Sequence, residues 1–163
     1  MAQSHPTYFA SLDRWEKGRA EIISGSVKHY VFSNIFDVAS RSRPYEKVVV
    51  GKNLEYVLEA LRADGDSPWF ACRHDEFAIC MDGEIEIGFV KLEAPPAGKD
   101  GATLVKGEPS GQRMGLVRLR RGHQALLPAG AAYQFRAAKK GVIVMQTILG
   151  ELSVEKWAEI CEK

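Results

Sequence analysis

Short segments of strand-forming residues, most of them bounded by glycine- or proline-containing turns, recur along this chain and constrain its fold more than any other feature. Val48–Val50 is β-branched and lies between Pro44 and Gly51, and 124–127 ends at the turn 128–130. The other segments that we assign to strands lie at 29–34, 53–62, 69–81, 84–92, 114–119, 133–136 and 141–149. Many short strands at a spacing of about 8 to 12 residues predict an all-β sandwich or barrel.

Two of these assignments depend on local detail. In 53–62, Leu54, Leu58 and Leu61 also fit the spacing of a helix. We assign a strand, because strands and turns follow this segment and tertiary pairing commonly overrides local propensity. The segments 69–81 and 84–92 flank Asp82-Gly83 with apolar residues on both sides, which predicts a β-hairpin.

A short helix is expected at each end of the chain. Ser11 can cap a helix over 11–23, and Ser153 can cap one over 153–162. The 163 residues suffice for one globular domain and are too few for two ordinary ones. We therefore expect one domain over 1–163, with a barrel core at about 30–150 and with 1–29 and 153–162 as extensions. The turn-rich stretches 94–101 and 106–111 are expected to form an exposed connection.

Charge and cysteine content limit the partners and the compartment. Lys and Arg together number 22 against 21 Asp and Glu, so no large net field attracts nucleic acid or an anionic membrane surface. The N-terminus has neither a basic start nor an apolar run, and no segment approaches the ~18 apolar residues of a membrane span. The three cysteines, Cys72, Cys80 and Cys161, form no metal or redox motif and are expected as reduced thiols. These features predict a cytoplasmic protein without a nucleic-acid or membrane partner.

Two short motifs point to a particular barrel. Glu76 is followed after six residues by Gly83, and Gly122 is followed after five residues by Pro128 and then by Gly130. In this order and about forty residues apart, the two stretches resemble the signature motifs of the cupin superfamily. The resemblance implies a cupin-type jelly-roll barrel with short N-terminal and C-terminal helices.

The metal ligands of that superfamily are largely missing. Metal-binding cupins carry His-x-His three or four residues before the glutamate, and these positions fall here on Phe70 and Cys72, or on Trp69 and Ala71. After the second motif, Tyr133 stands where a histidine is expected. We therefore favour a barrel that has lost its metal.

A candidate pocket remains around the first motif. His74 lies two residues before Glu76 and on the same strand face, which Cys72 shares. Together with Tyr133, these residues form either a rearranged metal site or a metal-free polar cluster. The pair of His74 and Glu76 can act as an acid/base or ligand-binding pair, or it can simply satisfy buried polarity. No catalytic residue is assigned.

The chain as a whole resembles a narrower family, the small (alpha) subunit of the two-component hydroquinone 1,2-dioxygenases. The stretches that carry this resemblance are Phe32-Ser-Asn-Ile-Phe36, Arg43-Pro-Tyr-Glu-Lys47, Gly51-Lys-Asn-Leu-Glu-Tyr56, Ser67-Pro-Trp-Phe70, His74-Asp-Glu-Phe77 and Asp82-Gly-Glu84, with a terminal helix containing Trp157. The resemblance implies a small subunit without a cofactor of its own, paired with a larger cupin subunit that holds Fe(II).

The implied complex is a hetero-oligomer, for example a heterotetramer, that converts hydroquinone and dioxygen to 4-hydroxymuconic semialdehyde. The N-terminal segment with Tyr8, Phe9 and Trp15 is then expected to be covered by the partner. Two alternatives stay open. One is a self-sufficient homodimeric metal-dependent enzyme that uses His74, Glu76 and Tyr133. The other is a cupin that binds a small ligand without catalysis.

Overall fold

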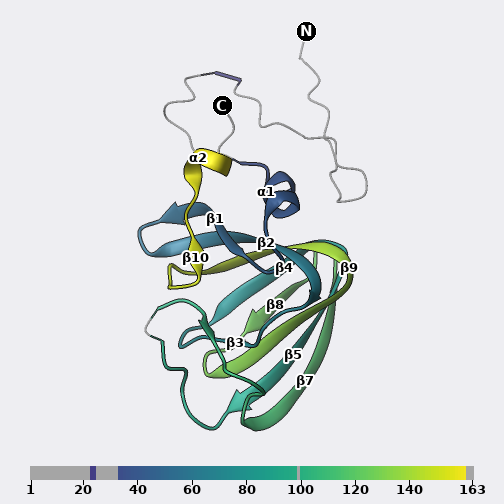
Figure 1. Cartoon of the computed structure of the whole chain (residues 1–163), viewed down its shortest axis with the longest axis vertical. Coiled ribbons are helices and arrows are strands. Elements are labelled where there is room, and N and C mark those ends of the chain that lie inside the picture. The colour runs from purple at the N-terminus through teal and green to yellow at the C-terminus, as the bar shows by residue number, and fades with distance from the viewer. Residues whose placement is uncertain (1–22, 25–32, 99, 161–163) are drawn as a thin grey trace.

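The computed structural model describes residues 23–24, 33–98 and 100–160. These residues form one curled sheet with two short helices (Figure 1). The elements, in chain order, are α1 (Ile35–Arg41), β1 (Lys47–Asn53), β2 (Tyr56–Asp66), β3 (Phe70–Ala71), β4 (Glu76–Asp82), β5 (Glu84–Leu92), β6 (Thr103–Leu104), β7 (Gly111–Arg120), β8 (Gln124–Leu127), β9 (Ala131–Ile148), β10 (Ser153–Val154) and α2 (Trp157–Ile160).

The long strand β9 organises the sheet. Along one edge it pairs with β2 and then with β3, and along the other edge with β4 and then with β5. β1 and β10 extend the sheet beyond β2, β6 lies beyond β3, β8 beyond β4, and β7 beyond β5. The segments 133–136 and 141–149, expected as two strands, therefore belong to a single strand that crosses both halves of the curled sheet (Figure 1).

The all-β prediction is confirmed, and 53–62 contributes to a strand as expected. The predicted hairpin at Asp82-Gly83 is wrong, because β4 and β5 pair with successive parts of β9 and not with each other. Gly83 adopts φ +80, and a Cβ there would lie 3.0 Å from the Gly141 Cα. This turn thus directs the chain from one half of β9 to the other in a conformation that favours glycine.

The helices differ from the expectation. The predicted helix at 11–23 and the strand at 29–34 lie almost wholly outside the described residues. Asn34 is not in a strand but caps α1, which we did not predict, by accepting hydrogen bonds from the Phe36 and Asp37 N–H groups. The C-terminal helix begins at Trp157 and not at Ser153, because Ser153 pairs with Lys47 in the parallel β1–β10 ladder.

The two faces of the sheet are buried differently. The inner face carries the main core, which includes Leu61, Phe70, Tyr133, Phe135 and Met145. On the outer face, α1 and α2 contribute to a second cluster of buried residues, namely Val38, Val48, Ala60 and Ile160. In the connection that we expected to be exposed, Gly101 and Ala102 are buried, because the chain returns to the sheet at β6. Neither helix in the described ranges has the length and apolar character required to cross a bilayer.

Candidate functional site

The structure brings together the four pocket residues predicted from the sequence. Cys72 follows β3, His74 lies in the connection to β4, Glu76 begins β4, and Tyr133 lies on β9. The sulfur, nitrogen and oxygen atoms of Cys72, His74 and Glu76 lie within 4.8 Å of one another. A fifth member, Thr147 of β9, was not predicted. It lies two residues after the buried Met145 and therefore on the same face of the strand. The cluster faces the interior of the curled sheet.

Glu76 is the centre of this cluster. It is fully buried, and its Oε2 accepts a hydrogen bond from the Tyr133 hydroxyl at 2.6 Å while its Oε1 accepts one from the Thr147 hydroxyl at 2.7 Å. Burial, followed by the charge of Glu76, raises the pKa of Tyr133 well above its ordinary value. Tyr133 therefore stays a phenol and donates its proton, so that both carboxylate oxygens have partners within the chain.

His74 extends the network. Its Nε2 lies 3.0 Å from the Thr147 Oγ1, and the hydroxyl of Thr147 donates to Glu76. The backbone N–H of Ile148 is directed at the same nitrogen, at 3.3 Å. The Thr147 hydroxyl thus connects His74 to Glu76.

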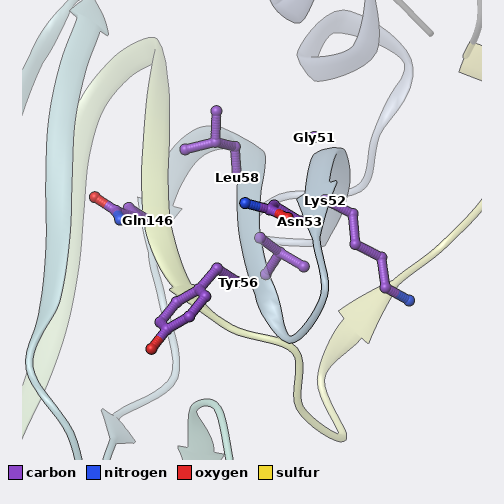
Figure 2. A pocket seen from close by; sticks show the side chains of 7 residues that line it. Gly51, Lys52, Asn53, Tyr56, Leu58 and Gln146 are labelled. Carbon is purple, nitrogen blue, oxygen red and sulfur yellow. The ribbon is translucent and has the colours of Figure 1, made fainter.

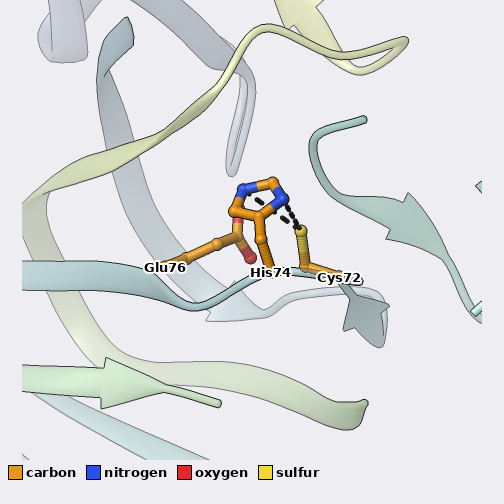
Figure 3. A group of neighbouring side chains, drawn as sticks. All are labelled: Cys72, His74 and Glu76. Carbon is orange, nitrogen blue, oxygen red and sulfur yellow. Dashed lines mark hydrogen bonds between the residues drawn. The ribbon is translucent and has the colours of Figure 1, made fainter. Parts of the chain in front are cut away.

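Cys72 lies against the His74 ring (Figure 3). Its sulfur is 3.1 Å from Nδ1 and 3.4 Å from Nε2, so it faces the ring and is not in line with the lone pair of either nitrogen. The thiol donates to the Gly101 carbonyl oxygen at 3.2 Å. Burial raises the pKa of Cys72 to about 11, which keeps the thiol protonated near neutral pH.

A buried ion pair lies in the same interior and was not predicted. Lys47 Nζ is 3.5 Å from Glu59 Oε2 and 3.2 Å from the Met145 sulfur, and it lies 4.9 Å from the centre of the Phe70 ring. The second oxygen of Glu59 accepts a hydrogen bond from the Ser153 hydroxyl at 2.6 Å. Lys47 and Glu59 are both at least 98% buried. The alternation of side chains along a strand could have indicated that Lys47 points inward, because it lies two residues before the buried Val49 and on the same face.

Cys72, His74 and Glu76 place a sulfur, a nitrogen and a carboxylate close enough together to hold a metal ion. An oxygen-activating iron centre needs nitrogen and carboxylate lone pairs that converge on one point and leave coordination positions open. Here both Glu76 oxygens accept hydrogen bonds from the chain, a phenol occupies the position of the histidine, and the Cys72 sulfur faces the His74 ring. Aromatic side chains pack beside the cluster: the Tyr133 ring centre is 5.8 Å from Phe70 and 5.4 Å from Phe135. Both oxygens of Glu76 thus have hydrogen-bond partners within the chain.

The fold and the motifs together define the class of this protein. Glu76 opens β4, Gly83 makes the turn after it, and Pro128 to Gly130 make the turn before β9. On a curled antiparallel sheet these features are those of a cupin. A scan of family models found no match, and a search of curated proteins found none either.

Solved structures give the family. The chain is 61% identical to a chain of hydroquinone 1,2-dioxygenase PnpCD in complex with Cd²⁺ and 4-hydroxybenzonitrile, with 98% of both chains covered and a TM-score of 0.89. It is 46% identical to hydroquinone 1,2-dioxygenase from Sphingomonas sp. TTNP3 with 4-hydroxybenzoate bound, with 98% of this chain and 99% of that chain covered and a TM-score of 0.87. The chain belongs to the hydroquinone 1,2-dioxygenase family, which confirms the resemblance seen in the sequence.

A second kind of chain in the same enzyme shares the fold alone. In PnpCD solved with Fe³⁺, a chain matches this one at 15% identity with a TM-score of 0.64. The match covers 83% of this chain but 38% of that chain, so that chain is more than twice as long.

Proposed function

We propose that this chain is the small, iron-free subunit of an Fe(II)-dependent hydroquinone 1,2-dioxygenase and that it supports a larger, iron-bearing cupin subunit. The observation that carries the proposal is the 61% identity over nearly the full length of a PnpCD chain. An enzyme of the same name also contains a chain more than twice as long with the same fold. This chain corresponds to the short one, which supports a hetero-oligomer; a heterotetramer would be a simple symmetric form.

The reaction that we assign to the complex opens the ring of a para-diphenol. Hydroquinone and dioxygen give 4-hydroxymuconic semialdehyde: one ring carbon–carbon bond breaks, and both oxygen atoms of dioxygen enter the product. The iron that this chemistry requires is assigned to the larger subunit. The donor geometry around Glu76 supports this assignment, because the hydroxyls of Tyr133 and Thr147 already bind both carboxylate oxygens.

Within this chain we assign Cys72, His74, Glu76 and Tyr133 a structural role. A buried carboxylate is costly unless its hydrogen bonds are satisfied, and this network satisfies them without an ion. The interior then stays closed by side chains, and the subunit acts on catalysis through its surface, by stabilising the partner and shaping the entrance to the partner's pocket.

Reconstitution tests the proposal. The tagged chain is expressed alone, and also together with the longer cupin chain of its own dioxygenase, and hydroquinone consumption is followed with dioxygen uptake. We expect the two chains to co-purify and only the complex to turn over hydroquinone. Turnover by the lone chain would favour the self-sufficient enzyme built on His74, Glu76 and Tyr133. Binding of a phenol by the lone chain without any association of the longer chain would favour a binding module.

A further inference from the structure

A row of uncharged side chains crosses the outer face of the sheet. Gln146 of β9 lies opposite Leu58 of β2 on one side and opposite Phe77 of β4 on the other, and Phe77 lies opposite Leu126 of β8. Residues directly opposite each other in antiparallel strands project from the same face. We call these four residues the outer stripe. Leu58, Phe77 and Leu126 are 45%, 39% and 48% exposed, whereas their sequence neighbours Glu59, Glu76 and Leu127 are buried.

The outer stripe continues into a groove at one end. Leu58 and Gln146 line it together with Asn53, the 52%-exposed Tyr56 and Lys52, and its volume is about 620 Å³ (Figure 2). The charge of Lys52 is paired with Glu155 at 3.0 Å. The adjacent row of the same face, with Val48 and Ala60, lies in the cluster to which α1 and α2 contribute. Among the residues that the structure describes, the helices therefore leave the outer stripe and its groove exposed.

The other half of the sheet carries charged pairs beside its exposed apolar side chains, Met114, Leu116 and Val117 of β7. There Arg118 pairs with Glu86, Arg120 pairs with Glu84, and Arg136 lies 3.8 Å from Asp66. Exposed charged pairs of this kind suit a solvated surface. The outer stripe has no charged member: its three exposed apolar side chains lie with one exposed amide, Gln146, among them. Exposed apolar surface free of charge marks an interaction site.

We propose that the outer stripe and its groove are the surface on which the larger cupin subunit docks, with a neutral sheet face of that subunit packed against them. This inference rests on the proposed function. The long PnpCD chain shares this fold and so has a comparable sheet, and two sheets pack face to face through uncharged side chains. The lack of charge on the outer stripe requires a partner face that is also uncharged.

The first described helix lies beside this surface. The continuous described chain begins at Ser33, directly before the cap of α1, and α1 contributes Val38 to the cluster on the outer face. One partner surface can therefore contact both the outer stripe and α1.

Substitution of the outer stripe tests the docking surface. The double variant Leu58→Gln, Phe77→Gln replaces two exposed apolar side chains by uncharged polar ones and so removes apolar contact area. Its matched control is Leu116→Gln on β7, where the leucine is 58% exposed. Each chain is titrated against the purified longer chain of its own dioxygenase by calorimetry. We expect the dissociation constant of the double variant to rise about tenfold or more and that of the control to stay within about twofold.

The arms of the experiment separate the possible failures. If the native chain does not bind the longer chain, the proposed function fails; if it binds and the double variant binds equally well, the docking surface is wrong. A double variant that instead dissociates a homodimer of this chain would assign the outer stripe to a second copy. If the double variant binds the longer chain more weakly only while residues 1–22 are present, the outer stripe would be assigned to the chain's own N-terminal segment. Circular dichroism and thermal unfolding of the isolated variants exclude misfolding as the cause.

Discussion

At the scale of single residues, Glu76 shows how a cupin motif can persist without its usual ligands. The carboxylate is fully buried and keeps two short hydrogen bonds, from the hydroxyls of Tyr133 and Thr147. Tyrosine in place of histidine supplies a donor where a metal-binding barrel has a ligand. The carboxylate is thus stabilised by protons of the chain, and its burial needs no metal ion.

Tyr133→Phe is the most direct residue-scale prediction. The variant removes one donor from the buried Glu76 carboxylate, and we expect the free energy of unfolding to fall by about 1–3 kcal/mol in urea titrations. The iron content of the assembled dioxygenase should not change, because no ligand is lost. The control Tyr45→Phe removes a hydroxyl that bonds the Gly65 carbonyl at 2.6 Å, far from the cluster in sequence. Loss of most of the iron in Tyr133→Phe alone would show that the cluster binds the metal.

Tyr45 gives a prediction for alkaline pH. Burial raises its pKa from the ordinary 10.0 to about 12. The phenol ionises at lower pH in the unfolded chain, so its contribution to stability is complete below about pH 10 and is lost as the pH rises to about 12. Tyr45→Phe should therefore show a smaller fall in unfolding free energy between about pH 8 and about pH 11 than the native chain. Exposed Tyr56→Phe should retain the native fall; an identical fall in both variants would contradict the assignment.

At the scale of elements, the buried pair of Lys47 and Glu59 joins strands that are far apart in the sequence. Lys47 begins β1, Glu59 lies on β2, and Ser153 of β10 donates to Glu59. Removal of one partner of a buried pair leaves a charge without compensation. The pair thus fixes the register of the β1–β10 end of the sheet.

Lys47→Met should lower the free energy of unfolding by about 3–5 kcal/mol, because Glu59 then loses its countercharge. The double variant Lys47→Met, Glu59→Gln removes both charges and should recover a large part of that loss. Urea unfolding of both variants and of Glu59→Gln completes the cycle. A loss in the double variant equal to the sum of the losses in the two single variants would mean that the pair contributes no coupling.

Several elements could be predicted from the sequence, and the exceptions have physical reasons. β8 and the strand assignment of 53–62 followed from strand propensity and turn spacing. α1 was missed because its signal is one capping residue, Asn34, ahead of only seven helical residues. β10 was read as the start of a helix, since Ser153 is also a good cap and only its pairing with Lys47 decides between the two.

The same contrast holds for the candidate site. Parity along the first motif and the position after the second placed Cys72, His74, Glu76 and Tyr133 together. Thr147 could not be assigned, because a threonine in an apolar strand has no distinctive pattern. Lys47 and Glu59 were missed for another reason: charged side chains are rarely buried, and their partners across the sheet depend on a register that sequence patterns do not give.

At the scale of the whole molecule, the inner and outer faces of the sheet differ in what they carry. Aromatic rings and a satisfied polar network fill the inside of the curled sheet. The outer stripe leaves apolar surface uncovered next to α1 and α2. The chain belongs to a family whose named member PnpCD also contains a longer chain of the same fold, and the proposed docking surface gives the outer stripe a partner.

Metal analysis of purified proteins tests this account most directly. The chain alone, the longer cupin chain alone and their complex are loaded with Fe(II) without oxygen, desalted and measured for iron per chain and for hydroquinone turnover. We expect less than about a tenth of an iron per molecule in the lone chain, about one iron per longer chain in the complex, and turnover in the complex only. About one tightly held iron in the lone chain, together with ring-opening turnover, would contradict the central claim.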